Sequence, residues 1–372
     1  MIRSVVSILA LATASLVASA SPASTGAGQV LDEQRALESY ALMERYYYVP
    51  ATRSYVGTYP SAGPAQVWPY SQALAAVLEL ARMPGGGAGT LTAVPGTISR
   101  LAVYRAPVAG LAYAPVYHGR GNPFYDDNAW IGIELVEAGD LLHNRAELTA
   151  AAQVFAWLET GWDTKADACR GGVYWLMPRG KYWNRSPGSR YRTAVSTVNA
   201  ALLGVLLYEH TGRHADLRWS ERAYRWSQQC LGTPDALLAD HIDAQGNVTS
   251  DIHSYNQGAL VATAVNLYRT TGSRRYLADA VRTANASLTA FRDPLQSDDD
   301  PVFLAIYYGD LLQLAPYARG PEIRAAINAF ASQAWAQARD PATGLFHFGH
   351  TLSTLLDQAA MVQVYAELAR TT

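Results

Sequence analysis

The sequence predicts an all-α protein that folds as an (α/α)6 barrel of six helical hairpins. Three observations lead to this fold class. Apolar residues recur with the helical period in twelve segments, several segments are joined by the same kind of glycine turn, and strongly apolar segments alternate with amphipathic ones. An open solenoid of helical hairpins is the alternative arrangement.

The helical period defines the twelve segments, with little β signal between them. The first six are predicted at 31–48, 65–82, 96–105, 127–139, 145–160 and 193–210. The second six are predicted at 215–231, 256–271, 275–291, 301–314, 321–338 and 352–368.

Three connections share one pattern, in which a helix ends at a glycine within a short polar turn. These connections lie at 137–140, 209–213 and 269–273. Glycine adopts the left-handed conformation that ends many helices. Because Gly212 and Gly272 are 60 residues apart, the spacing suits one helical hairpin per repeat.

The even-numbered segments are the more apolar ones, as in 201–207 and 259–265, whereas 220–225 belongs to an amphipathic segment. A helix that is apolar around most of its circumference belongs inside, and an amphipathic helix belongs outside. Six inner and six outer helices therefore form a closed barrel. The inner helices then run parallel, and their N-terminal ends meet at one end of the barrel.

The first twenty residues have the features of a secretory signal peptide: Arg3, an apolar run at 5–17 and the cleavage pattern Ala18-Ser19-Ala20. Residues 21–30, rich in Ser, Gly, Ala and Pro, are expected to form a disordered leader. Residues 31–372 are expected to form a single domain, because the glycine-rich stretch 84–89 is too short to separate two. We therefore expect a secreted protein, and the scarcity of Lys beside Arg suggests a bacterial source.

Charge and composition exclude several classes of partner. A net charge of −2 and an isoelectric point near 6.4 argue against nucleic acid and an anionic membrane surface, and favour a neutral substrate. No segment after residue 20 reaches the roughly 20 apolar residues of a membrane span. Cys169 and Cys230 form either one disulfide or two free thiols, since spacing cannot decide between them.

The run 123–130 places Asp126 and Asp127 between aromatic residues, just ahead of an apolar helical segment. Cleavage of a glycosidic bond requires one carboxyl as an acid and a second as a nucleophile or base, and aromatic rings can stack on a sugar. The alternative is structural. Aspartate is also favoured at the N-cap and in the first turn of a helix.

Aromatic and polar residues precede or begin every predicted inner helix, so they are expected to line a single carbohydrate cleft. The candidates are Trp68, Gln72, Tyr125, Asn128, Trp175, Asn199, Tyr255, Asn256 and Gln257, with further groups at 191–193, 298–300 and 346–350. Trp68 and Tyr255 could instead cap the barrel core, and Asn256 with Gln257 could cap a helix. We expect no metal, because His347 and His350 lack ligand partners, and no cofactor fingerprint is present.

Four runs resemble glycoside hydrolase family 76, the family of endo-α-1,6-mannanases: 125–130, 171–175, 196–203 and 255–258. The resemblance covers most of the chain after about residue 35. It implies an (α/α)6 catalytic barrel and a retaining double displacement on α-1,6-linked mannose of a mannan-type polysaccharide. It also implies that Asp126 is the nucleophile and Asp127 the acid/base. Family members often carry a second aromatic residue where this chain has Ile131-Gly132, which leaves the sugar subsites open.

Elementary geometry agrees with a retaining mechanism. Neighbouring Cα atoms lie about 3.8 Å apart, so adjacent aspartates reach the roughly 5 Å separation of a retaining site more easily than the wider inverting separation. As the acid, Asp127 is expected to have a pKa above its ordinary value of about 3.9. The alternatives are a mannan transglycosidase on the same scaffold, a non-catalytic glycan-binding barrel, which would be expected to lose one carboxylate, and other (α/α)6 enzymes, whose carboxyls usually lie on separate loops.

Overall fold

The computed structural model describes residues 22–60, 63–84, 87–108, 110–165, 168–178, 188–293, 295, 300–349 and 352–371. Within these ranges the side chains are described from residue 28 to residue 370, except at 87 and 88. The predicted signal peptide at 1–20 lies outside the described residues.

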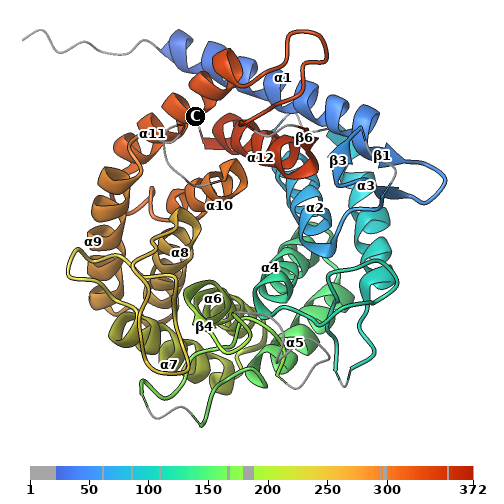
Figure 1. The fold of residues 1–372 in the computed structure, drawn as a ribbon. Coiled ribbons are helices and arrows are strands. Elements are labelled where there is room, and N and C mark those ends of the chain that lie inside the picture. Colours follow the sequence, from blue (N-terminus) through green and yellow to red (C-terminus); the bar gives the residue numbers. More distant parts are fainter. Residues whose placement is uncertain are drawn as a thin grey trace, which may run out of the picture.

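Six inner helices form a closed ring, which confirms the predicted barrel and excludes the open solenoid (Figure 1). Each inner helix contacts the next, and the last contacts the first. The inner helices are α2 (Val67–Arg82), α4 (Tyr125–Leu141), α6 (Ala194–Thr211), α8 (Ser254–Thr271), α10 (Pro301–Leu312) and α12 (Leu355–Thr371).

The odd-numbered helices surround this ring, and the hydrophobic core lies between the two layers (Figure 1). They are α1 (Pro22–Tyr47), α3 (Gly87–Arg100), α5 (Arg145–Glu159), α7 (His214–Cys230), α9 (Arg274–Ala290) and α11 (Gly320–Gln337). Helix α1 packs on α12, and α3, α5, α7 and α9 each pack on the inner helix that precedes them in the chain. Helix α11 packs on α10 and α12.

Burial explains this layering. Every residue of α8 from Ser254 to Leu267 is buried, whereas α7 buries one face that includes Trp219, Ala223 and Trp226. Close contact between inner helices requires small residues. A Cβ at Gly132 of α4 would lie 2.3 Å from Leu203 Cδ2 of α6. Gly132 therefore lies at a close packing contact between α4 and α6.

The predicted glycine turns are confirmed at two of three places. Helices α6 and α8 end at Gly212 and Gly272, which have φ values of 69° and 72° and whose N–H groups each bond the carbonyl four residues earlier. The third expectation was wrong, because Gly139 lies inside α4 and the left-handed residue is His143, at φ 51°. A Cβ at Gly139 would lie 2.9 Å from Leu148, so this glycine permits close packing on α5.

Two segments differ from the sequence-based expectations because tertiary packing overrides local composition. Helix α1 begins at Pro22, within the expected disordered leader, where the Gln29 side chain donates to the Ala369 carbonyl of α12 at 3.0 Å. Helix α3 begins at Gly87, within the glycine-rich stretch, and packs on α2 through residues that include the buried Val94. A 3-10 helix, η1 (Leu101–Tyr104), occupies most of the rest of the segment predicted at 96–105.

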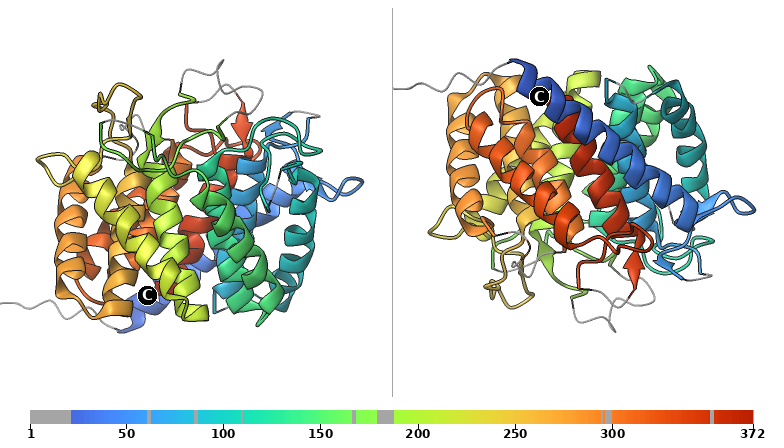
Figure 2. Two further views of the ribbon diagram at one scale, coloured as in Figure 1. Left: turned by 90° about the horizontal axis from the view of Figure 1, so that it is seen from below. Right: turned by 90° about the horizontal axis from the view of Figure 1, so that it is seen from above.

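Three short antiparallel pairs tie together the loops that precede the inner helices. They are β1 (Tyr48–Val49) with β2 (Ser54–Tyr55), β3 (Thr58–Tyr59) with β6 (Ser353–Thr354), and β4 (Arg192–Thr193) with β5 (His241–Ile242). The long loops gather at one end of the barrel, as Figure 2 shows from two sides. In the described part of the chain, no helix is both long and apolar enough to cross a membrane.

Candidate active site

A cavity of about 430 Å³ opens at the end of the barrel where the inner helices begin. Seven of the residues predicted for the cleft line it together: Trp68, Asp126, Asp127, Trp175, Tyr191, Thr193 and Tyr255. The remaining lining residues are Gln66, Pro115, Phe124, Trp130, Val195, Asp240, His241 and Phe303. The structure therefore brings residues from five inner helices to one place, and we call this cavity the cleft.

Asp126 and Asp127 lie in the first turn of α4, which begins at Tyr125. Neither caps the helix, because the N-cap residue is Phe124 and it has no side-chain capping bond. The two side chains are nearly buried, with 8% and 9% of their surface exposed. At the start of a helix, backbone N–H groups and the macrodipole favour negative charge. The start of α4 therefore stabilises the charge of one carboxylate, although the side chain is buried.

The two oxygens of Asp126 have different environments. The Trp175 indole Nε1 donates to Asp126 Oδ2 at 2.9 Å, which fixes the plane of the carboxylate. The other oxygen, Oδ1, is buried and has no hydrogen-bond partner among the described residues. An oxygen with free lone pairs, held in place by its neighbour, is what a nucleophile needs.

Electrostatics separates the two carboxyls. Burial raises the pKa of both above the ordinary range, but the hydrogen bond from Trp175 and backbone N–H groups oppose that rise at Asp126. Among the described residues no hydrogen bond offsets burial at Asp127, and the neighbouring charge of Asp126 raises its pKa further. Asp127 therefore holds its proton more firmly than Asp126, whose pKa is raised to about 7, in the direction that the sequence argument expected for the acid.

Four of the aromatic rings that line the cleft contact one another; among them, Trp130 lies in the 123–130 run noted in the sequence, whereas Phe303 was absent from the sequence-based candidates. The Trp68 ring stacks on both, with centroids 5.7 Å apart in each case. The Tyr255 ring lies 4.3 Å from Phe303 and 6.1 Å from Trp130. Phe303 is the third residue of α10, just after the 298–300 run, so its position relative to the predicted helix start could have indicated it.

A third carboxylate, Asp240, also lines the cleft and was missed by the sequence analysis. Its Oδ2 lies 2.9 Å from His241 Nδ1, and its Oδ1 accepts from Asn256 Nδ2 at 3.1 Å. These hydrogen bonds lower its pKa against the effect of burial, so Asp240 carries a charge. It lies well before α8 in the chain and reaches the cleft beside the β4–β5 pair, a tertiary pairing that no local sequence pattern reveals.

Three predicted substrate-binding residues have structural partners instead of a place on the cleft wall. The Tyr125 ring stacks on Trp157, with centroids 4.3 Å apart. The Asn128 amide bonds both backbone groups of Tyr113, and the Gln257 amide bonds both backbone groups of Leu238. Asn128 and Gln257 therefore hold loops in position beside the cleft.

The other predicted residues lie elsewhere. Gln72 and Asn199 face a second cavity of about 360 Å³, deeper in the barrel. Asp300 caps α10, with its Oδ1 accepting from the Val302 N–H at 3.1 Å. The backbone N–H of His347 donates to Ala338. Residues 298, 299 and 350 lie outside the described residues.

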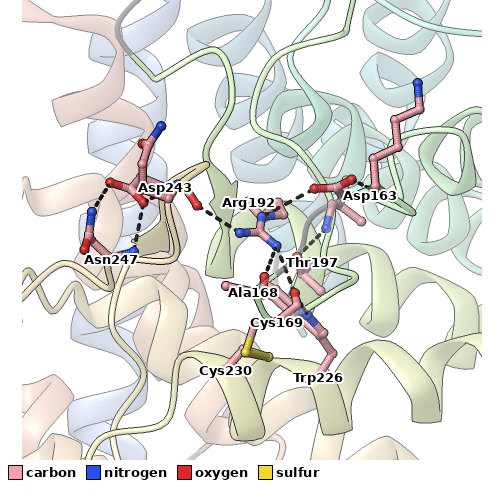
Figure 3. A network of polar contacts seen from close by, with 12 residues as sticks. Asp163, Ala168, Cys169, Arg192, Thr197, Trp226, Cys230, Asp243 and Asn247 are labelled. Carbon is pink, nitrogen blue, oxygen red and sulfur yellow. Dashed lines mark hydrogen bonds and ion pairs between the residues drawn. A yellow bond between two sulfur atoms is a disulfide. The ribbon is translucent and has the colours of Figure 1, made fainter.

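A buried arginine joins the loops that carry cleft residues (Figure 3). Arg192, only 1% exposed, donates to the carbonyls of Ala168, Cys169 and Asp243 at 2.8 to 3.0 Å. Cys169 and Cys230 form a disulfide, which settles the two alternatives left by the sequence and fastens this loop to α7. The loop that carries Trp175 and the turn after His241 are thus tied together.

The helical double ring and the pair of buried carboxyls in an aromatic cleft are features of the (α/α)6 glycoside hydrolases. The chain belongs to glycosyl hydrolase family 76, whose sequence model matches residues 31–368. This membership confirms the resemblance inferred from the sequence.

Individual relatives are more distant. A solved family 76 mannosidase from Bacteroides thetaiotaomicron has a TM-score of 0.80 at 22% identity, over 91% of this chain and 98% of that one. The α-1,6-mannanase GH76A of Salegentibacter sp. HEL1_6 has a TM-score of 0.75 at 20% identity, over 92% of this chain and all of that one. These two likenesses concern the fold.

Among curated proteins, the chain is similar to the mannan endo-1,6-alpha-mannosidase DCW1 of Saccharomyces cerevisiae. The two are 30% identical over 180 residues, which are 45% of this chain and 38% of that protein. The match thus spans less than half the length of the curated relative. Since the relatives include yeast and bacterial proteins, they give no support to the bacterial source that the composition suggested.

Proposed function

We propose that the chain is a secreted glycoside hydrolase that cleaves α-1,6-mannosidic linkages of mannan-type polysaccharide by a retaining double displacement. The observation that carries this proposal is the adjacent carboxyl pair in the cleft, in which one member is held by Trp175 and the other keeps its proton. Family membership and the activity printed for the yeast and Salegentibacter relatives support the choice of bond.

In the first step, Asp126 Oδ1 attacks the anomeric carbon while Asp127 gives its proton to the leaving glycosidic oxygen. A glycosyl ester on Asp126 forms and the glycosidic C–O bond breaks. In the second step, Asp127, now ionised, takes a proton from water as that water attacks the same carbon and releases Asp126. Two inversions leave the anomeric configuration unchanged.

The rest of the cleft binds the sugar. Trp68, Trp130 and Tyr255 line the cleft, and the parts of their rings that reach it supply apolar contacts for the C–H groups of a pyranose. Asp240 is ionised and held by Asn256 and His241, so it accepts hydrogen bonds from sugar hydroxyls in a fixed direction. These groups form a neutral-sugar site and position the reacting carbon against Asp126.

A relative also depends on a pair of neighbouring aspartates. An inactive variant of the Salegentibacter mannanase, in which two neighbouring aspartates are replaced by asparagine, was solved with α-1,6-mannotriose. At 18% identity that structure shows only a shared fold, so the carry-over to Asp126 and Asp127 rests on the cleft geometry.

The test is digestion of linear α-1,6-mannan by the purified protein, with sizing of the products. We expect shorter α-1,6-linked oligosaccharides, and at least about a 10²-fold loss of rate in Asp126→Asn and in Asp127→Asn. Absence of new reducing ends would contradict the proposal. Products longer than the starting chains would instead indicate the transglycosidase, an alternative that the largely aromatic lining of the cleft favours by limiting access of water.

Secretion and domain organisation are part of the same proposal. The N-terminal 20 residues are removed on export, and residues 31–372 form one catalytic domain. N-terminal sequencing of the exported protein, expected to begin at Ser21, tests the cleavage site.

A further inference from the structure

A separate cavity of about 420 Å³ adjoins the cleft. Pro115 and Phe124 line both cavities, so these two residues form the boundary between them. The remaining lining residues of the adjoining cavity are Val116, Arg120, Gly121, Asn122 and Leu176. The Phe124 ring also lies 4.9 Å from the Trp175 ring, and Trp175 donates to Asp126. Phe124 therefore lies between the adjoining cavity and the indole that holds the proposed nucleophile.

The walls of the adjoining cavity are built before any ligand arrives. On one side, Val116 and Arg120 exchange two backbone hydrogen bonds of 3.0 Å, and the Pro115 carbonyl accepts from Val67 N–H of α2. On the other side, Phe124 pairs with Leu176 in an isolated β-bridge. A site with preformed walls loses little freedom on binding.

The chemistry of the lining is that of a sugar site. Pro115, Val116, Phe124 and Leu176 present apolar groups, while Arg120 and Asn122 supply hydrogen-bond donors. Asn122 is only 6% exposed, and its Nδ2 has no hydrogen-bond partner among the described residues. A buried amide without a partner is unusual in proteins, and the hydroxyl oxygen of a ligand would satisfy it.

We propose that the adjoining cavity is a subsite for a further hexosyl residue of the glycan whose bond is cleaved in the cleft. This inference rests on the proposed function. The hexosyl residue comes either from the next unit of the main chain or from a branch on it, and both have the same pyranose chemistry. The subsite makes the enzyme prefer substrates that extend beyond the two sugars at the cleaved bond.

The test measures binding without turnover. The Asp126→Asn/Asp127→Asn variant is titrated calorimetrically with linear α-1,6-mannooligosaccharides of increasing length, and with the same oligosaccharides carrying a single mannosyl branch. The measurements are repeated after adding Asn122→Ala, which removes the amide, or Val116→Phe, which fills the cavity. Asn328→Ala, an exposed amide on α11, is the matched control.

We expect one added hexosyl residue to tighten binding about tenfold in the parent and in Asn328→Ala. Asn122→Ala and Val116→Phe should each abolish that step and leave the affinity for the shorter ligand unchanged. A gain in affinity with the longer linear ligands shows that the subsite binds a main-chain unit. A gain only with the branched ligands shows that it binds a branch. If the added hexosyl residue tightens binding equally in all variants, or in none, the proposed subsite is wrong and the proposed function is unaffected. No binding of any α-1,6-mannooligosaccharide, together with no cleavage of mannan by the wild type, contradicts the proposed function as well.

Discussion

Asp126 and Asp127 have the same side chain but different environments. The indole of Trp175 and backbone N–H groups stabilise the charge on Asp126, whereas burial and the charge of Asp126 keep the proton on Asp127. Two roles thus follow from one residue type, because the neighbours of each carboxyl differ.

Azide rescue separates the two roles. In Asp127→Ala, a mannoside with an activated leaving group still forms the glycosyl ester on Asp126, and azide then releases it as the α-mannosyl azide. In Asp126→Ala no ester forms, and azide displaces the leaving group directly to give the β-azide. The anomeric configuration of each azide is read by NMR. If the two variants exchange products, the roles are reversed.

Trp175→Phe tests the hydrogen bond to the nucleophile while keeping an aromatic ring. The indole bond lowers the pKa of Asp126, so its loss raises that pKa. Because attack requires ionised Asp126, the acidic limb of the kcat/KM profile should move to higher pH, by about one unit for a charge-assisted hydrogen bond. The pH profiles of both enzymes give the shift. An unchanged acidic limb would show that this bond does not set the ionisation of the nucleophile.

Residues at the same position, counted from the start of each inner helix, tend to have the same role. The second or third residue of five of them reaches the cleft: Trp68, Asp126, Asp127, Val195, Tyr255 and Phe303. The fourth residue of four helices bonds the backbone of a loop: Asn128, Thr197, Gln257 and Gln358. The sixth residue, as in Gln72 and Asn199, lies about 7.5 Å past the first along the axis and faces the deeper cavity.

Gln257→Leu tests the role of the fourth position. The change leaves the backbone N–H and carbonyl of the buried Leu238 without partners, which should destabilise the protein by about 2 to 4 kcal/mol. It should also loosen the nearby Asp240, so KM should rise more than kcat falls. Urea unfolding and steady-state kinetics measure the two effects.

Asn328→Leu on the exposed surface of α11 is the control for Gln257→Leu, and it should change stability by less than about 0.5 kcal/mol. Equal stability of the wild type and Gln257→Leu would show that the Gln257 side chain does not hold the Leu238 loop in place.

The deeper cavity of the barrel contains buried carboxyls that the cleft does not use. Burial, followed by the charge of Glu137, raises the pKa of Glu134, which is 4% exposed and lines this cavity. The folded protein therefore holds this proton at a pH where the unfolded chain has lost it. The contribution of this protonated Glu134 to the free energy of unfolding is complete below the pKa of about 4.3 in the unfolded chain. It is lost as the pH rises toward the pKa of Glu134 in the folded protein.

Glu134→Gln removes that titration. The free energy of unfolding of the variant minus that of the wild type should increase from pH 5 to pH 8. Urea unfolding at both pH values measures this difference. A difference that stays constant with pH would mean that the pKa of Glu134 is the same in the folded and the unfolded protein.

The architecture of the whole molecule was largely predictable from the sequence, but parts of the cleft were not. Apolar periodicity and Gly212 and Gly272 indicated the double ring, because these are local signals. Asp240 was missed, since it reaches the cleft beside a strand pair between distant loops. Gln257 was assigned to substrate because an amide near an inner-helix start has the same sequence pattern whether it bonds a sugar or a loop.

The central claim is that adjacent aspartates at the start of one inner helix cleave an α-1,6-mannosidic bond with retention. The most direct measurement is proton NMR of the anomeric signals during digestion of linear α-1,6-mannan by the wild-type protein, recorded before mutarotation. This account predicts that the new reducing ends appear first as the α-anomer. Appearance of the β-anomer first would contradict the double displacement, and with it the assignment of Asp126 as nucleophile.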